Sequence, residues 1–350
     1  MEKEIFIECR ELSIGYHERS TAAALVKQDI SIRALKGEMV ALIGGNGIGK
    51  STLLKSIAGF QPALSGELLV HGRSITDFGS EELAKEMSFV STENVRVANL
   101  TVREMVGLGR FPYTNWFGQL NNHDRAIIDQ AIFQVGLSGY ENRSVNKISD
   151  GERQRAMIAR ALAQDTPIIV LDEPTAFLDI SNKYEIVRIL HQLTSDHGKC
   201  ILFSTHDLNT ALTMADRIWL MLKDSVVEGI PEDVMSKGYL ESLFQDNTHL
   251  YFDTEGGDFR IRKEQKGVVV ISATGSELKW AAKALERLGY EVAPSHSDPS
   301  SPRPLVPSSG IRIVQQAKGW TLNYSGYTCE PETLEDLCQE VKKIRLPPES

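Results

Sequence analysis

The chain has 350 residues, of which 41% are hydrophobic and 24% are charged. These values are typical of globular proteins and predict about two domains. Lys and Arg number 38 against 47 Asp and Glu, so the net charge of −9 argues against a nucleic-acid partner held by bulk positive charge. The chain starts without the basic and apolar regions of a secretory signal, and no apolar run approaches the ~20 residues that cross a bilayer. We therefore expect contact with a membrane only through a partner.

The four cysteines are scattered along the chain, with no Cys-x-x-Cys pair and no nearby histidine at zinc-binding spacing. This distribution predicts reduced thiols in a cytosolic protein.

Up to about residue 245, short apolar runs alternate with amphipathic stretches, which predicts a largely parallel α/β sheet. The expected strands are 38–44, 168–172 and 200–204, and the helices expected after them are 50–60, 181–193 and 208–215. An insertion, 101–149, separates the first two of these strands. It carries two expected helices, 101–109 and 123–136, on either side of an aromatic-rich turn, 111–117.

The pattern changes near residue 250, which predicts a small separate α+β domain over 248–350 after a first domain over 1–247. Its expected strands are 268–272, 310–315 and 320–324, and its expected helices are 277–288 and 332–344. The segment 294–310 holds five prolines and six serines, so we expect a mobile loop there. This domain carries no motif that indicates a role.

A phosphate-binding pattern, G-x-x-x-x-G-K-[ST], occurs once, between an expected strand and an expected helix. Glycines let the backbone turn tightly, so that several N–H groups converge on phosphates at a helix N-terminus. Lys50 is then expected to reach the β- and γ-phosphates and Ser51 to place its hydroxyl on Mg²⁺. The predicted nucleotide-binding residues of this segment are Gly44, Gly45, Asn46, Gly47, Ile48, Gly49, Lys50, Ser51 and Thr52.

Acidic and imidazole side chains follow two of the other expected strands. Asp172 ends an apolar run and could hold Mg²⁺ beside Ser51, while Glu173 could polarise an attacking water as general base. His206 follows the next strand and could sense the γ-phosphate. Alone, each of these residues would more often be structural, but the phosphate-binding pattern upstream favours the functional interpretation.

The segment 148–155, Ile-Ser-Asp-Gly-Glu-Arg-Gln-Arg, resembles the signature of the ATP-binding subunits of ABC transporters, usually Leu-Ser-Gly-Gly-Gln/Glu. The resemblance covers roughly 4–245. It implies a P-loop NTPase fold, with a RecA-like core and a helical subdomain at about 95–150, and it implies ATP and Mg²⁺ as cofactors. In that family two copies of the subunit enclose two ATP molecules. The residues that would then act in trans are Ser149, Asp150, Gly151, Glu152 and Asp179.

The same resemblance assigns roles to residues already singled out. Glu173 corresponds to the catalytic glutamate and His206 to the switch histidine, and Tyr16 matches the aromatic residue that stacks on adenine. The signature departs from the family pattern at Asp150, whose carboxylate would repel phosphate unless it points outward or meets Arg153.

A second departure concerns the family's Q-loop glutamine, which is missing. Thr92 occupies its place by position and Glu93 follows, so either could contribute an oxygen ligand to Mg²⁺. The sequence leaves the choice between them open.

Within the family, the segments 100–104 and 108–113 resemble subunits that energise importers of iron chelates and cobalamin. This implies an ATPase at the cytoplasmic face of the inner membrane that powers uptake of an iron complex, either a ferric siderophore or haem. The implied partners are a second copy of the chain, a permease and an external substrate-binding protein. The aromatic run 111–117 would help to grip a permease helix, with ordinary packing as the alternative. Cobalamin import, export and a non-transport ABC ATPase are the competing functions.

Overall fold

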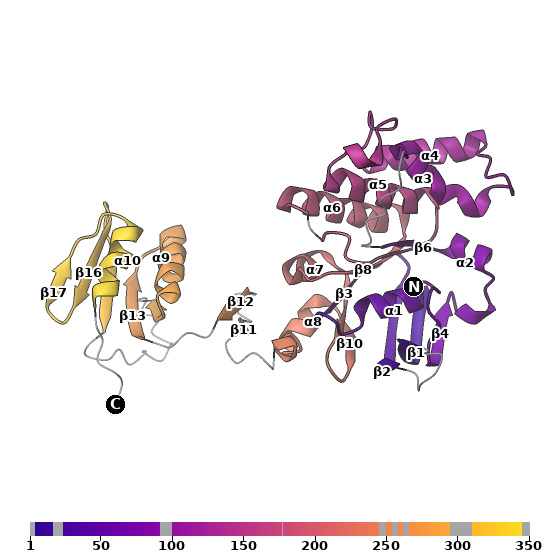
Figure 1. The fold of residues 1–350 in the computed structure, drawn as a ribbon. Helices are drawn as coiled ribbons and strands as arrows, with labels where there is room; N and C mark the ends of the chain where they lie inside the picture. The colour runs from indigo at the N-terminus through magenta and orange to yellow at the C-terminus, as the bar shows by residue number, and fades with distance from the viewer. Residues whose placement is uncertain are drawn as a thin grey trace. The chain divides into compact units, whose positions relative to one another are not determined.

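The computed structural model describes residues 4–16, 24–91, 100–176, 178–244, 250–253, 258–261, 266–294 and 310–344. The chain divides into two compact units, the first of Met1–Asp246 with Phe252–Asp258 and the second of Asn247–Tyr251 with Phe259–Ser350 (Figure 1). Thr92, Glu93 and nearly all of the expected loop 294–310 lie outside the described residues.

A six-stranded sheet forms the centre of the first unit, in the order β10-β9-β3-β8-β7-β6. Neighbouring strands are parallel except β10, which is antiparallel to β9. Every residue of β3, β7 and β8 is buried, as expected for strands with both faces covered. The strands are β3 (Met39–Gly44), β6 (Met87–Val90), β7 (Ile168–Leu171), β8 (Cys200–Ser204), β9 (Arg217–Met221) and β10 (Val226–Gly229).

A second, antiparallel sheet has the order β2-β1-β4-β5 and differs from the largely parallel arrangement expected from the sequence. Its strands are β1 (Ile5–Tyr16), β2 (Ala24–Leu35), β4 (Ser65–Val70) and β5 (Arg73–Ser74). The pairing of β1 with β2 contains several register shifts, which interrupt the alternation of apolar and polar residues by which a strand is recognised. Both sheets share one apolar core with α1 (Lys50–Ile57).

Outside the insertion, the other α-helices described in the first unit are α2 (Ser80–Glu86), α6 (Ile180–His197), α7 (Leu208–Met214) and α8 (Pro231–Ser236). The helix expected at 181–193 continues to His197 and ends at Gly198, whose left-handed backbone (φ 63°) closes its last turn. Within the described residues, no helix is long and apolar enough to cross a membrane.

The insertion forms a helical subdomain with α3 (Val102–Gly107), α4 (Asn122–Gln134) and α5 (Asp150–Ala163), and a 3-10 helix, η2 (Leu108–Tyr113), follows α3. Each of the three α-helices begins with a capping box, in which the side chains of the cap residue and of the third helical residue satisfy each other's backbone N–H groups. The aromatic turn is exposed, with 74% of Phe111, 95% of Trp116 and 82% of Phe117 accessible to solvent.

A buried ion pair holds this subdomain together. Arg110 Nε donates to Asp124 Oδ1 at 2.9 Å, and Arg110 Nη1 donates to the Ala163 carbonyl at the end of α5. The two side chains are only 5% and 3% exposed. Burial would raise the pKa of the Asp124 carboxyl, but hydrogen bonds from the Asn121 N–H and from Arg110 outweigh it and lower that pKa. The stabilisation is therefore present at neutral pH and is lost as the pH falls through the folded-state pKa of Asp124.

Replacing Arg110 with Met should lower the free energy of unfolding by about 3–5 kcal/mol, because it leaves a buried carboxylate without its partner. Urea denaturation measures the change. Arg103→Met is the matched control, since Arg103 pairs with Asp129 at the surface and its loss should cost less than about 1 kcal/mol. Equal losses of unfolding free energy in the two variants would show that the buried Arg110–Asp124 pair stabilises the protein no more than the exposed pair does.

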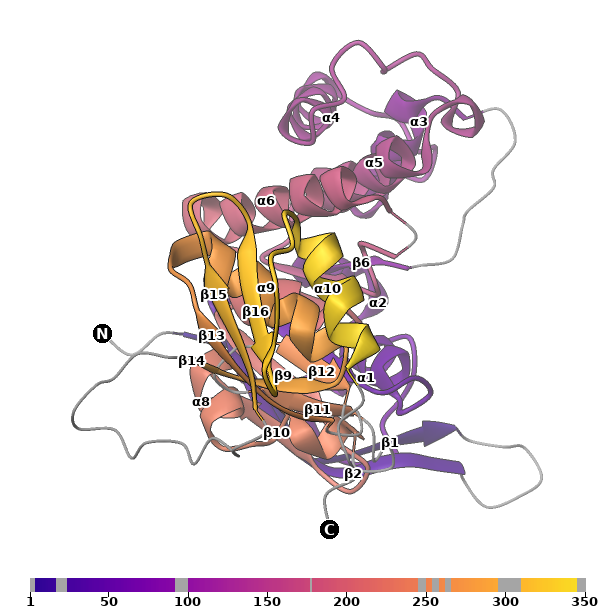
Figure 2. The ribbon, with the colours of Figure 1, turned by 90° about the vertical axis from the view of Figure 1, so that its left-hand side faces the viewer.

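β11 (Leu250–Asp253) and β12 (Asp258–Ile261) form a two-stranded sheet whose residues are divided between the two units. The second unit contains a five-stranded sheet in the order β14-β13-β15-β16-β17. β13 is parallel to β14 and β15, and the last three strands are antiparallel. Helices α9 (Gly275–Arg287) and α10 (Leu334–Lys343) share one apolar core with this sheet (Figure 2). The strands are β13 (Gly267–Ser272), β14 (Tyr290–Pro294), β15 (Ile311–Gln315), β16 (Trp320–Tyr324) and β17 (Tyr327–Cys329).

Candidate nucleotide-binding site

Three neighbouring strands of the central sheet position the predicted site. β3, β8 and β7 are parallel and adjacent in that order, so their carboxyl ends lie at one edge of the sheet. Gly44 ends β3, Ser204 ends β8 and Leu171 ends β7. The loops that follow carry the phosphate-binding pattern, the acidic pair and His206. Ligands bind at such edges in open α/β sheets.

The loop 45–49 leads from β3 into α1 and has the backbone that its glycines allow. Gly47 and Gly49 have φ values of 74° and 111°, which side-chain-bearing residues rarely adopt. A Cβ at Gly49 would lie 2.5 Å from Val26 Cγ1, whereas one at Gly45 or Gly47 would meet nothing within 4 Å. The loop is therefore packed against the protein on one side and open on the other, where phosphates could reach its N–H groups.

The amine of Lys50 lies across this loop. Lys50 Nζ donates to the Gly44 carbonyl at 2.9 Å and to the Gly45 carbonyl at 3.0 Å. Burial lowers the pKa of the Lys50 amine, and the negative charges of Glu173 and Asp172 oppose that shift. A cation, open N–H donors and carboxylates thus meet in one place, and this donor set fits a triphosphate with a divalent cation.

A serine that the sequence analysis did not assign to the site connects the two acidic residues. Ser204 Oγ donates to Asp172 Oδ1 at 2.7 Å and accepts from the Glu173 backbone N–H at 2.8 Å. Glu173 itself has a left-handed backbone, with φ 47°. Asp172 is only 4% exposed, whereas the Glu173 side chain is 28% exposed. The turn therefore keeps one carboxylate buried and leaves the next one accessible.

His206 lies against the accessible carboxylate. Its Nε2 and Glu173 Oε1 share a hydrogen bond of 2.6 Å, and 44% of the histidine side chain is exposed. The sequence placed both residues at one sheet edge, and the structure brings their side chains into contact. The imidazole is thus able to orient the carboxylate and to respond to charge next to it.

Tyr16 ends β1 and points to the start of α1. Its hydroxyl shares a hydrogen bond of 3.0 Å with Thr52 Oγ1, and 51% of the residue is exposed. Two predicted nucleotide-binding residues from distant parts of the sequence are therefore in contact. The exposed aromatic side chain next to the phosphate loop fits the predicted stacking on adenine.

The predicted signature lies at the start of α5. Ser149 caps this helix and exchanges hydrogen bonds with Glu152, and the Ser149 backbone N–H lowers the pKa of the Glu152 carboxyl. Asp150 is 75% exposed and accepts a hydrogen bond of 2.7 Å from Arg153 Nη1. The pairing with Arg153, one of the two arrangements that would reduce its repulsion of phosphate, is thus present.

Asn182 links the signature to the other residue predicted to act in trans, and the sequence analysis missed it. Its backbone N–H donates to Asp179 Oδ1 at 2.8 Å, and its Nδ2 donates to Asp179 Oδ2 at 3.0 Å. A Cβ at Gly151 would lie 2.6–2.8 Å from three atoms of the Asn182 side chain. Glycine at position 151 therefore lets α5 approach the start of α6.

Gly151→Ala should lower the ATPase rate by about 10- to 100-fold, because small displacements of catalytic groups are costly and the clash of the new Cβ with the Asn182 side chain pushes the first turn of α5 away from α6. Steady-state phosphate release by the purified protein measures the effect. Asn182→Ala removes the three clashing atoms, so the double variant should recover part of the lost rate. A double variant as slow as Gly151→Ala alone would refute this contact as the cause.

The structure describes one protomer, in which α5 and α1 lie in different parts of the first unit (Figures 1 and 2). The action of the signature and of Asp179 on a second protomer's nucleotide stays a prediction. The same holds for Thr92 and Glu93 as Mg²⁺ ligands, because both lie outside the described residues.

Two family models match the chain. The one described as ABC transporter covers residues 27–176, and the one described as iron ABC transporter C-terminal domain covers residues 266–342. The iron(3+)-hydroxamate import ATP-binding protein of Bacillus subtilis strain 168 is 36% identical over 71% of this chain and 90% of its own. The petrobactin import ATP-binding protein of Bacillus anthracis is 35% identical over 70% of this chain and 94% of its own.

Solved structures of ABC transporter proteins also match the chain. A chain of a transporter described as of the metal-chelate type, in an inward-facing conformation, matches with a TM-score of 0.60 and 26% identity, over 71% of this chain and 90% of its own. A dimeric bacterial ABC transporter cassette matches with a TM-score of 0.57 and 27% identity, over 64% and 98%. The expected fold, an ABC ATPase cassette followed by a small α+β domain, is confirmed.

Proposed function

The chain belongs to the ATP-binding proteins of ABC transporters, in the iron-siderophore import subfamily, and we propose on this premise how its residues drive uptake of a ferric siderophore. Two copies close on ATP, pull on a permease and reopen after hydrolysis. The observation that carries the proposal is the convergence of Lys50, Asp172 and the Glu173–His206 pair at the carboxyl edge of the sheet.

Each of these residues has a proposed role in hydrolysis. Lys50 releases the two loop carbonyls and binds the β- and γ-phosphates, while the N–H groups of the loop surround them. Ser51 and Asp172 hold Mg²⁺, and Ser204 keeps the Asp172 carboxylate oriented. Glu173 accepts a proton from the attacking water, and His206 holds that carboxylate in position.

The subdomain that carries the aromatic turn offers a surface for the proposed permease. A hollow of about 490 Å³ opens between α3, η2 and α4, and exposed Leu108 and Phe111 contribute to its lining. Arg110, on the same 3-10 helix, ties this surface to the end of α5, whose first turn is the signature. Movement of a docked permease helix could therefore shift α5 as a rigid element and so move the signature relative to the nucleotide. Such docking would hold the chain at the cytoplasmic face of the membrane.

The proposed cargo follows from the subfamily, whose relatives are named for import of iron hydroxamates and petrobactin. Haem and cobalamin are the competing cargoes within the proposal. In the importer an external substrate-binding protein would deliver the cargo to the permease.

Uptake of radiolabelled ferric hydroxamate by a strain that lacks this gene tests the proposal. The intact gene should restore uptake, and the Lys50→Ala gene should not. Haem and radiolabelled cobalamin serve as the comparison cargoes in the same strain. Restoration of cobalamin uptake alone would contradict the siderophore assignment, and restoration of ferric hydroxamate uptake by Lys50→Ala would contradict the ATP-driven mechanism.

A further inference from the structure

Among the residues that the structure describes, only one face of the five-stranded sheet of the second unit packs against helices, α9 and α10. Alternate strand residues, among them Val269, Ile311 and Leu322, belong to the core shared with α9 and α10. Because successive side chains of a strand point to opposite faces, the residues between them point away from both helices. This second surface, which we call the open face, has a different composition from the core.

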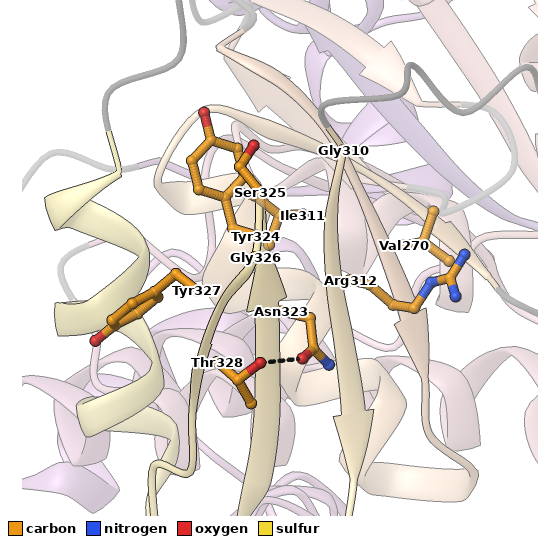
Figure 3. A pocket seen from close by; sticks show the side chains of 10 residues that line it. All are labelled: Val270, Gly310, Ile311, Arg312, Asn323, Tyr324, Ser325, Gly326, Tyr327 and Thr328. Carbon is orange, nitrogen blue, oxygen red and sulfur yellow. Dashed lines mark hydrogen bonds between the residues drawn. The ribbon is translucent and has the colours of Figure 1, made fainter.

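A single cross-strand row crosses the open face. Val270 of β13 pairs with Arg312 of β15, Arg312 pairs with Asn323 of β16, and Asn323 pairs with Thr328 of β17. Paired residues of adjacent strands lie side by side on one face. Figure 3 shows the Asn323 amide against the Thr328 hydroxyl, while the Arg312 side chain extends from the neighbouring strand toward Val270.

These residues line a hollow of about 400 Å³, together with the turn between β16 and β17 and the start of β15. Among the described residues that line it there is no carboxylate, although the chain as a whole carries a net charge of −9. Tyr327 also borders the hollow, but its hydroxyl donates to Glu340 on α10 and so faces the helices. The groups that remain for a ligand are therefore mainly hydrogen-bond donors and one cation.

The hydrogen bonding of the row directs its donors into the hollow. Thr328 Oγ1 donates to Asn323 Oδ1 at 2.7 Å, so the Asn323 carbonyl already has a partner and its NH₂ group remains to donate. Arg312 is exposed, and within the described parts of the chain no acidic side chain forms an ion pair with it. A guanidinium without a carboxylate partner can bind a planar oxyanion through two parallel hydrogen bonds.

We infer that the open face of the second unit binds a small molecule through a planar oxyanion, a carboxylate or a group of the same shape. Arg312, whose exposed side chain can turn toward β16, forms two parallel hydrogen bonds with this group, and the Asn323 amide donates a third. Val270 is 7% exposed and supplies an apolar floor beside the charged group. The inference uses none of the residues assigned to ATP hydrolysis, so it does not rest on the proposed transport function.

Calorimetric titration of the full chain with citrate, in magnesium-free buffer at constant ionic strength, tests the inference. The wild type should bind with one site outside the phosphate loop, and the Lys50→Ala variant should retain that site. Arg312→Gln should weaken binding by roughly ten-fold or more, because a neutral amide cannot replace the charged two-pronged contact. Asn323→Ala should weaken binding less than Arg312→Gln.

Two matched variants control for charge and for position. Lys318→Gln removes an exposed cation at the other end of the β15–β16 hairpin, and Tyr327→Phe changes a bordering residue whose hydroxyl faces α10. Neither should change citrate affinity by more than about two-fold, less than the loss of a single hydrogen bond would cause. Absence of citrate binding to the wild type, an Arg312→Gln variant that binds normally, or equal losses in Lys318→Gln would overturn the inference. Sulfate that binds as tightly as citrate would overturn the assignment of a planar group.

Discussion

Glu173→Gln should lower the ATPase rate by about two to four orders of magnitude, the usual contribution of a general base, while ATP binding persists. Glutamine keeps the size of the side chain and an oxygen that can accept from His206, so the contact of 2.6 Å between the two side chains can remain. What it loses is the ability to take a proton from water. Phosphate release measures the rate, and fluorescent ATP measures binding.

Glu81→Gln is the matched control, because this exposed carboxylate of α2 pairs only with Lys85 at the surface. Its ATPase rate should equal that of the wild type. Unchanged hydrolysis by Glu173→Gln would place the general base elsewhere. Loss of ATP binding together with hydrolysis would assign Glu173 a role in building the site rather than in catalysis.

The sequence predicted best those strands whose apolar residues follow a regular pattern. β8 (Cys200–Ser204) and β16 (Trp320–Tyr324) have the expected bounds, because an uninterrupted or strictly alternating apolar run identifies a strand by itself. β1 and β2 were not predicted as strands, because their register shifts break that alternation and because polar residues occupy much of their length. Their antiparallel sheet is defined by pairing between distant segments, which no local pattern encodes.

The candidate site likewise contains residues that the sequence predicts and residues that it does not. Lys50, Asp172 and Glu173 follow recognisable strands within local motifs, so their common location at one sheet edge was predictable. Ser204 and Asn182 were missed because each acts through residues about 30 positions away, Ser204 through Asp172 and Asn182 through Gly151. The signal available for Ser204 was its place as the last residue of the strand that turned out to lie between the other two.

Lys50→Met should weaken ATP binding by roughly 100-fold, because each charge-assisted hydrogen bond to phosphate contributes about 1.5–3 kcal/mol. Methionine keeps the apolar stem that packs in the buried position and removes only the amine. Methionine also removes the two hydrogen bonds to the loop carbonyls, so thermal unfolding of each protein without ATP is the baseline for its response to ATP. Added ATP should raise the unfolding temperature of the wild type but not of the variant.

Lys55→Met provides the matched control, because Lys55 lies one turn later on the same helix, α1, outside the phosphate-binding pattern. It should bind ATP as the wild type does. If both variants lost ATP binding equally, the effect would come from the overall charge of α1 and not from the amine that spans the loop. If Lys50→Met kept its affinity for ATP, we would infer that Lys50 stays bonded to the loop carbonyls when ATP is bound. The loop N–H groups alone would then have to hold the phosphates. Loss of ATP binding in Lys50→Met but not in Lys55→Met would show that the phosphate-binding loop depends on the amine of Lys50.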